Sequence, residues 1–139
     1  MCLSIKVRSP ERVLAEGIAN GHEWVVMHNN AGFRCGYVKV KPGHPWHGQE
    51  PSATVHGGIT FAEADVPCGN GDDNGWWVGF DCAHLGDAPD PLLPGSSASI
   101  AWDETVRDQE YVEEECRSLC KQANSVNQSK RWSYSRGCG

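Results

Sequence analysis

Two runs of β-prone residues predict a β-hairpin in the first third of the chain. The segment EWVVMHNNAGFRCGYVKV holds both runs, and Asn29, Asn30, Ala31 and Gly32 separate them. Asn and Gly tolerate the positive φ angles of tight turns, so the chain is expected to reverse here. The preceding segment SPERVLAEG is compatible with one helical turn or with an edge segment.

A further extended segment, ATVHGGITFAE, has a strand pattern that Gly57 and Gly58 interrupt. Paired glycines within a strand mark a tight turn, a bulge or the close approach of another group. Loops rich in Pro, Gly and polar residues flank the segment on both sides, at KPGHPWHGQEPS and VPCGNGDDNG. The strand is therefore expected to be short or broken at the two glycines.

The segment WWVGFDCAH predicts a strand with two different faces, because side chains alternate along a strand. One face carries Trp76, Val78, Phe80, Cys82 and His84. The other face carries Trp77, Gly79, Asp81 and Ala83. One tryptophan should therefore face a helix and the other the open side of the sheet. A site that uses both Asp81 and Cys82 would have to form where the strand ends.

The last third of the chain predicts a helix from about Asp103 to Ala123. Thr105 followed by Asp108 resembles a capping box. One apolar stripe with helical spacing consists of Val112, Cys116, Leu119, Cys120 and Ala123. The stripe should pack on one face of a small, mainly antiparallel sheet, which makes the fold class α+β. We expect a single loop-rich domain over residues 1–125 and a flexible tail over 126–139.

Composition and charge narrow the classes of function. The chain has 139 residues, 39% of them apolar, with 16 Gly, 8 Pro and a net charge of −6. An acidic chain is not expected to bind nucleic acid broadly, because such binding relies on basic patches that displace counterions. The tail carries Lys130, Arg131 and Arg136, which are either solvated or in contact with nucleic acid or an anionic surface.

The cysteines and the N-terminal segment predict a cytoplasmic protein. The seven cysteines are odd in number and do not fall into tight pairs, which favours reduced thiols. MCLSIKVRSPERVLAEG has no apolar core of a signal peptide, and no stretch approaches the length of a membrane span. We therefore expect no membrane association, and the sequence does not predict an oligomeric state.

Candidate chemistry is concentrated in three blocks of the sequence. GHPWHG carries His44, Trp46 and His47, and VHGG carries His56, Gly57 and Gly58. The third block, DCAHLGD, carries Asp81, Cys82, His84 and Asp87. Each block places His beside Gly, Pro or a carboxylate, and we expect the three to surround one pocket.

The residues alone leave open two interpretations, a zinc site and a cysteine nucleophile. His47, His56 and His84 could hold zinc, which prefers His and Cys, although no common zinc motif is present. The alternative is that these histidines bond to the backbone of loops. Cys82 beside a histidine could act as a nucleophile, but a cysteine that follows Val78 and Phe80 on one strand face is better interpreted as a small buried hydrophobe.

Acid–base chemistry and ligand binding are the other candidates. Asp81 or Asp87 with His56 or His84 could activate water, whereas the same carboxylates could simply cap turns. Ligand-binding candidates are His44, Trp46, His47, Gly57, Gly58, Trp77 and Asp87. Flat tryptophan faces, backbone N–H groups at glycines and cationic side chains would suit a nucleotide-like ligand. Core packing is the competing explanation for the tryptophans.

The blocks GYVKVKPGHPWHG, VHGGITFAE and WWVGFDCAHLGD, followed by QEYVEEECRSLCKQ, resemble a family of small tailed-bacteriophage proteins of the actinophage type, whose function is unassigned. The matched blocks span residues 36–122 and leave out the first 20 residues and the tail. The resemblance implies an intracellular protein made during infection, in the cytoplasm of the host cell. It also implies that the three blocks belong together, and it supplies no catalytic assignment.

The leading hypothesis is a small phage accessory protein, for example one that acts against host defence. Its pocket of His, Asp and Trp would recognise a small polar, nucleotide-like ligand, with hydrolysis by Asp81, His84 and His56 as the candidate activity. The rival hypotheses are a non-enzymatic protein that binds a host protein through an exposed aromatic patch, and a domain with a structural zinc site.

Overall fold

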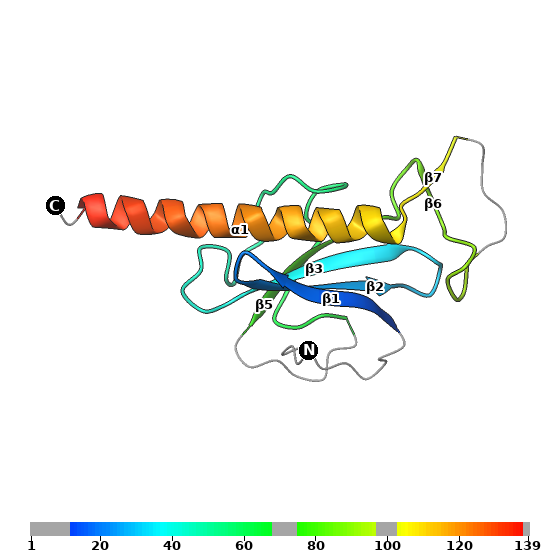
Figure 1. Cartoon of the computed structure of the whole chain (residues 1–139), viewed down its shortest axis with the longest axis horizontal. Coiled ribbons are helices and arrows are strands. Elements are labelled where there is room, and N and C mark those ends of the chain that lie inside the picture. The colour runs from blue at the N-terminus through cyan, green and yellow to red at the C-terminus, as the bar shows by residue number, and fades with distance from the viewer. Residues whose placement is uncertain (1–11, 68–74, 97–102, 138–139) are drawn as a thin grey trace.

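The computed structural model describes residues 12–67, 75–96 and 103–137 (Figure 1), and side chains are described up to Val126. A five-stranded antiparallel sheet has the order β1-β2-β3-β5-β4, and one long helix, α1, lies across one of its faces. The sheet strands are β1 Val13–Ala19, β2 His22–His28, β3 Arg34–Val40, β4 Phe61–Glu63 and β5 Trp76–Asp81. The remaining elements are β6 Asp87–Ala88, β7 Thr105–Val106 and α1 Gln109–Gly137. This arrangement confirms the α+β fold.

The predicted hairpin is confirmed by the antiparallel pairing of β2 with β3. Its turn is held by Asn29, whose side-chain oxygen accepts hydrogen bonds from the backbone N–H groups of Ala31 and Phe33 at 2.8 and 3.1 Å. A second tight turn joins β1 to β2, where Asn20 and Gly21 have φ angles of 51° and 79°. Two successive positive φ angles are typical of the two-residue hairpin turn. Residues 13–17 of the segment SPERVLAEG thus belong to β1, an edge strand, and residues 9–11 lie outside the described residues.

The apolar stripe of α1 forms the main core with the face of the sheet that it covers. All five predicted stripe residues have no exposed surface: Val112, Cys116, Leu119, Cys120 and Ala123. They pack with Trp24, Val26, Val38, Val78, Phe80 and Cys82 of the sheet and its margin. Gly36 in β3 permits this close approach, because an added Cβ would lie 2.5 Å from the Phe80 ring and 2.6 Å from Cys116 Sγ.

The opposite face of the sheet is covered as well. Trp77 has no exposed surface and belongs to a second cluster with Val25, Met27, Cys35, Tyr37 and Val66. Trp76 packs instead against the cluster under the helix, so the prediction that the two tryptophans face opposite ways is confirmed. The expectation of an open side is wrong, because Trp77 is enclosed and offers no flat face to a ligand.

Three predicted boundaries need correction. The helix begins at Gln109, not near Asp103, because Asp108 is its N-cap and accepts a hydrogen bond from the Tyr111 N–H at 2.9 Å. Thr105 therefore belongs to β7 and not to a capping box. Within residues 53–63 only β4 is a strand, and β5 ends at Asp81, which leaves Cys82 and His84 in the following turn.

The backbone of α1 continues to Gly137, into the segment expected to be a tail. The single domain over residues 1–125 and the flexibility of residues 126–139 stay predictions. Among the described residues, no helix combines the length and the apolar character that crossing a membrane requires.

Candidate functional site

Four side chains from three separate segments meet beside the N-terminal end of α1. We call Asp87, His56 and Tyr111 the relay, and Arg107 lies against it. His56 Nε2 is 2.8 and 3.0 Å from the two carboxylate oxygens of Asp87, and His56 Nδ1 is 2.9 Å from the Tyr111 hydroxyl. Arg107 Nε donates to Asp87 Oδ1 at 2.8 Å. The chain thus aligns a carboxylate, an imidazole and a hydroxyl in that order.

The position of His56 follows from two anchors on α1. The His56 N–H donates to Glu115 Oε1 at 2.8 Å. Thr54 exchanges two hydrogen bonds of 2.8 Å with the Gln122 side chain, one through its N–H and one through its carbonyl. These contacts lay the segment before Gly57 along the helix, and the His56 ring then reaches the first turn, where Tyr111 lies.

The position of Asp87 follows from the short parallel pairing of β6 with β7, which sets Asp87 beside Thr105. The same pairing brings Arg107, two residues farther along, to the carboxylate. A backbone N–H, that of His84, also donates to Asp87 Oδ2 at 3.0 Å. The side chain of Asp87 is only 2% exposed, so its charge is compensated almost entirely by these donors.

Hydrogen bonds keep the Asp87 carboxyl ionised. Burial alone would raise its pKa, but the hydrogen bonds from Arg107, from His56 and from the His84 N–H outweigh burial and lower the pKa. An ionised carboxylate only accepts hydrogen bonds, so the contact with Asp87 requires a proton on His56 Nε2. When Nδ1 carries no proton, it accepts the hydrogen bond of the Tyr111 hydroxyl.

Both ring nitrogens of His56 are therefore occupied, and the outer end of the relay is the Tyr111 hydroxyl. Burial and the nearby Glu115 carboxylate raise the pKa of Tyr111, so its hydroxyl holds its proton at neutral pH. The Tyr111 side chain is about one-third exposed, at 36%. A ligand at this surface would meet the phenol oxygen, not the imidazole.

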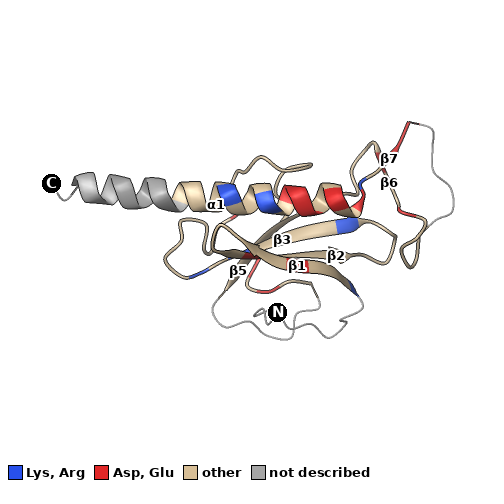
Figure 2. Ribbon diagram, in the orientation of Figure 1, with Lys and Arg blue, Asp and Glu red and all other residues tan. Residues whose placement is uncertain are grey.

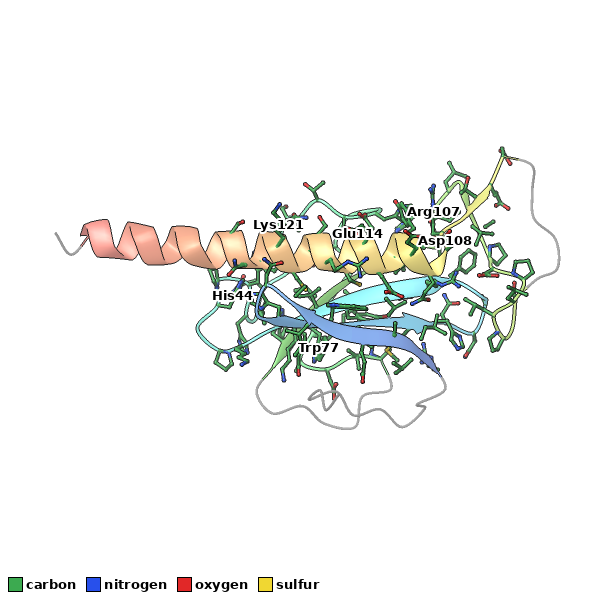
Figure 3. All side chains as sticks on the ribbon, in the orientation of Figure 1. His44, Trp77, Arg107, Asp108, Glu114 and Lys121 are labelled. Carbon is green, nitrogen blue, oxygen red and sulfur yellow. The ribbon has the colours of Figure 1, made fainter. Side chains whose placement is uncertain are left out.

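Arg107 supplies positive charge at the same surface. Its guanidinium carbon lies 5.3 Å from the centre of the Tyr111 ring, a cation–π distance. Within the described part of the chain, the Arg107 side chain has one hydrogen-bonding and ion-pair partner, the Asp87 carboxylate, which it contacts through Nε. Figure 3 shows Arg107 and Asp108 together at the start of the helix. Acidic residues follow on the next turns of α1 (Figure 2), so Arg107 adds a cation beside an acidic stretch of the helix.

His84 and Asp81 form a second pair next to the relay. The rings of His84 and His56 are 5.9 Å apart, and His84 Nε2 lies 3.3 Å from Asp81 Oδ1. The backbone of Gly57, with φ of 70°, passes so close to His84 that a Cβ there would overlap Nε2. The contact with Asp81 has the distance of an ion pair but not the geometry of a hydrogen bond, so His84 Nε2 is a buried atom without a hydrogen-bond partner among the described residues. Asp81 accepts hydrogen bonds from Ala83 N–H and the Thr60 hydroxyl.

Cys82 lies under this region as part of the core. It is 2% exposed, and burial and the Asp87 and Cys35 charges raise its pKa to about 12. A thiol of this kind does not supply a thiolate nucleophile at neutral pH. The interpretation of Cys82 as a buried hydrophobe is confirmed. The described cysteines are free and buried, and Cys2, Cys68 and Cys138 lie outside the described residues.

The block GHPWHG lies at the other end of the sheet. His44 Nε2 donates to the Ala123 carbonyl of α1 at 2.8 Å, and its Nδ1 accepts the Trp46 N–H at 2.9 Å. Trp46 is 6% exposed, and the His47 ring is 6.0 Å from that of Trp76. Trp76 and Asp81 are the two ends of β5, about 17 Å apart at 3.3 Å per residue. The structure therefore brings together two of the three expected blocks.

The described residues contain no group of three or more His, Cys, Asp or Glu side chains that could hold a metal ion. His56 and His84 are neighbours, but the loop that carries His47 packs at Trp76, at the opposite end of β5. The zinc set of His47, His56 and His84 is therefore not assembled.

The residues missed by sequence reasoning are Arg107 and Tyr111. Tyr111 lies in the first turn of α1 and Arg107 directly precedes the N-cap Asp108, in a region that was misplaced by the expectation of a helix from Asp103. Tyr111 directly precedes Val112, the first residue of the apolar stripe, so it is an aromatic residue outside the buried face. The position of an aromatic residue outside the apolar stripe was the signal in the sequence that could have pointed to Tyr111. Nothing local indicates that His56, 55 positions earlier, bonds to it.

Comparisons of this chain with protein-family models, with curated proteins and with solved structures find no match. The resemblance to tailed-bacteriophage proteins stays an expectation, and the function has to be argued from the site.

Proposed function

We propose that the protein binds a small, anionic, phosphate-bearing ligand beside the relay and hydrolyses it by acid–base catalysis. The supporting observation is the continuous chain of Asp87, His56 and Tyr111, which ends at a partly exposed hydroxyl next to the Arg107 guanidinium. A carboxylate that orients an imidazole, which in turn accepts a proton from a hydroxyl, is a recurrent catalytic arrangement on unrelated folds.

Tyr111 is the group that exchanges protons with the ligand in this proposal. As water attacks phosphorus, its proton passes to the Tyr111 oxygen while the Tyr111 proton moves to His56 Nδ1. The phosphorus–oxygen bond to the leaving group breaks, and His56 returns its proton through Tyr111 to the leaving oxygen. Asp87 stabilises the imidazolium that exists between these transfers, because it already receives the Nε2 proton in a hydrogen bond.

Arg107 would bind the anionic group. Guanidinium groups match phosphate oxygens with paired donors, and charge that develops on phosphoryl oxygens is stabilised by cations already in place. Asp87 holds Arg107 Nε, which leaves the terminal nitrogens to the ligand. Arg34 is nearby but structural, because it pairs with Asp90 at 2.9 Å in a buried contact.

Asp81 and His84 act as positioning residues in this scheme. Their pairing holds the turn after β5, and the His84 ring supports the backbone of Gly57 directly beyond His56. Stacking of a base on Trp46 or Trp77 has no support, because both rings are buried in the core. The proposal therefore rests on the anionic group of the ligand, and its nucleotide-like part stays a prediction.

The test is hydrolysis of 4-nitrophenyl phosphate and bis(4-nitrophenyl) phosphate, followed by the release of nitrophenol. Tyr111→Phe keeps the ring beside Arg107 and removes only the hydroxyl, so it should fold normally and lose about 100-fold in kcat, as expected for a lost proton-transfer group. His56→Gln should lose as much. Lys121→Gln, an exposed change on α1, is the matched control and should keep full activity. Turnover of neither ester, or equal turnover by Tyr111→Phe and the wild type, would contradict the proposal.

A second candidate is binding of a partner protein without catalysis. Two loop leucines on either side of β6 are fully or nearly fully exposed, Leu85 at 106% and Leu92 at 91%. Exposed large apolar side chains are frequent at interaction surfaces. An aromatic patch is not seen among the described side chains, where Trp24, Trp46 and Trp77 are buried. If Leu85→Ser with Leu92→Ser abolished capture of a partner while Tyr111→Phe did not, this candidate would replace the first.

A further inference from the structure

A surface pocket of about 440 Å³ lies beside the turn between β1 and β2. Three segments line it, namely this turn, the loop after β3 and one position of α1. The lining residues are Asn20, Gly21, His22, Lys41, Pro42, Gly43, His44 and Asn124. Ala123, next to Asn124, is about 18 Å from Tyr111 along α1 at 1.5 Å per residue. The pocket is thus separate from the relay, and Figure 3 shows His44 and Arg107 far apart along the helix.

The two histidines of the pocket differ in how many ring nitrogens are available to hydrogen-bond a ligand. His44 uses both ring nitrogens, one on the Ala123 carbonyl and one on the Trp46 N–H, so it forms a fixed wall. His22 Nδ1 is 3.2 Å from the Lys39 carbonyl and must donate to it, because a carbonyl only accepts. His22 Nε2 is therefore left for a ligand. The two rings meet edge to face, with centres 5.5 Å apart.

The other polar groups of the pocket are a cation and two amides. The side chains of Lys41, Asn20 and Asn124 make no hydrogen bond or ion pair within the described part of the chain. No Asp or Glu belongs to the lining, although the chain as a whole is acidic. Gly21 and Gly43 have φ angles of 79° and 95°, and an added Cβ at either would meet nothing within 4 Å. The rim is therefore open.

His22 is uncharged when the pocket is empty at neutral pH. Burial, the neighbouring His44 and the Lys41 charge lower its pKa, against the hydrogen bond to Lys39, which raises it. The Cys120 thiol of α1 lies at the backbone of His22, where it donates to the carbonyl at 3.7 Å. An anion placed between His22 and Lys41 would attract the imidazolium and so oppose the effects that lower the pKa of His22.

We propose that this pocket binds a small molecule through one oxyanion, a carboxylate or a tetrahedral phosphate- or sulfate-type group, held by Lys41 and by protonated His22. The amides of Asn20 and Asn124 would donate further hydrogen bonds to the same group. A volume of about 440 Å³ falls within the range of roughly 300–1,000 Å³ of ligand pockets, so more than the oxyanion fits. Binding takes up one proton at His22.

The test follows the ring resonances of His22 by NMR while sulfate, acetate or choline chloride is added to the full chain. Sulfate is the main probe because its own charge does not change between about pH 5 and pH 8, so any pH dependence belongs to the protein. Acetate is the arm that distinguishes a carboxylate from a tetrahedral anion, and choline is the cation control. His56→Gln disables the relay and should leave these shifts unchanged.

The expected result is a saturable shift of His22 with sulfate, acetate or both, at least fivefold tighter at pH 5.5 than at pH 7.5, and none with choline. Lys41→Gln, an exposed change, should weaken binding about tenfold at both pH values. His22→Gln, checked for an unchanged melting temperature, should remove the pH dependence. No saturable shift, equal binding at the two pH values, or unchanged binding by Lys41→Gln would each overturn the proposal.

Discussion

Each end of the sheet holds a pair of neighbouring histidines, and the two pairs are bound in different ways. The rings of His22 and His44 are 5.5 Å apart at the pocket, and those of His56 and His84 are 5.9 Å apart at the relay. At the pocket, the ring nitrogens that are engaged bond to backbone groups. At the relay, both nitrogens of His56 bond to side chains, those of Asp87 and Tyr111.

The difference shows which histidines can carry chemistry. A backbone carbonyl or N–H keeps its protonation state, so a ring bound to it on both sides, such as His44, is fixed in one tautomer and serves the fold. A carboxylate and a phenol can accept or release protons, so the ring between them, His56, lies on a path for proton transfer. His22 is intermediate between these cases, because Nδ1 is bonded to the Lys39 carbonyl and Nε2 is available to a ligand.

The largest effect should come from Asp87→Asn, which removes the charge that orients His56. We expect hydrolysis to fall at least 100-fold and the free energy of unfolding to fall by about 3 kcal/mol, because Arg107 loses its partner beside a buried amide. Chemical denaturation and nitrophenyl ester turnover measure the two losses. Asp81→Asn, at a carboxylate that is 33% exposed and lies beside His84, is the comparison, and equal losses in both variants would show that Asp87 has no special role.

At the pocket end of the sheet, His44→Gln should lower the stability of the protein without lowering turnover at the relay. Glutamine cannot satisfy both the Ala123 carbonyl and the Trp46 N–H at the same spacing, and an unsatisfied buried group costs about 2 kcal/mol. Turnover at the relay should stay within twofold of the wild type. A loss of turnover as large as that of His56→Gln would contradict the separation of the two ends.

The sheet and the helix stripe could be predicted because their signals are local. The turn at Asn29 and the five stripe residues depend on neighbours within one turn or one hairpin, and each was placed correctly. The start of α1 was misplaced because Thr105 has a competing role. It pairs with Asp87 in a two-residue parallel ladder, and such a contact between distant segments has no periodic signature in the sequence.

The candidate site was predictable only in part. The contacts of Gly57 with His84, and of Asp87 with His56, follow the expected association of VHGG with DCAHLGD. The loop with His47 was expected beside these residues too, but it packs at Trp76, and the length of β5 separates Trp76 from Asp81. Tyr111 could not be found without knowing that residues before Gly57 lie along α1, a contact made through Glu115 and Gln122.

The smallest expected effects are on the pH dependence of stability. Asp87 at the relay and His22 at the pocket should each reduce the stability of the protein in a different pH range. The pKa of Asp87 is lowered in the folded protein, so its contribution is present above the unfolded value of about 3.9 and is lost as the pH falls through the folded value. The pKa of His22 is also lowered, but His22 is a base. Its unfolded form therefore takes up a proton first, and stability declines as the pH falls below about 6.5, then levels off under the folded pKa.

Denaturation midpoints measured from pH 8 to about pH 2 should therefore show two separate windows. The decline below about pH 6.5 should shrink in His22→Gln and persist in Asp87→Asn, while the acid decline below about pH 4 should shrink only in Asp87→Asn. Saturating sulfate should reduce the first decline, because an anion in the pocket favours protonated His22 in the folded state. If both variants altered the same window, the two ends would be electrostatically coupled, and the separation argued from about 18 Å of helix would fail.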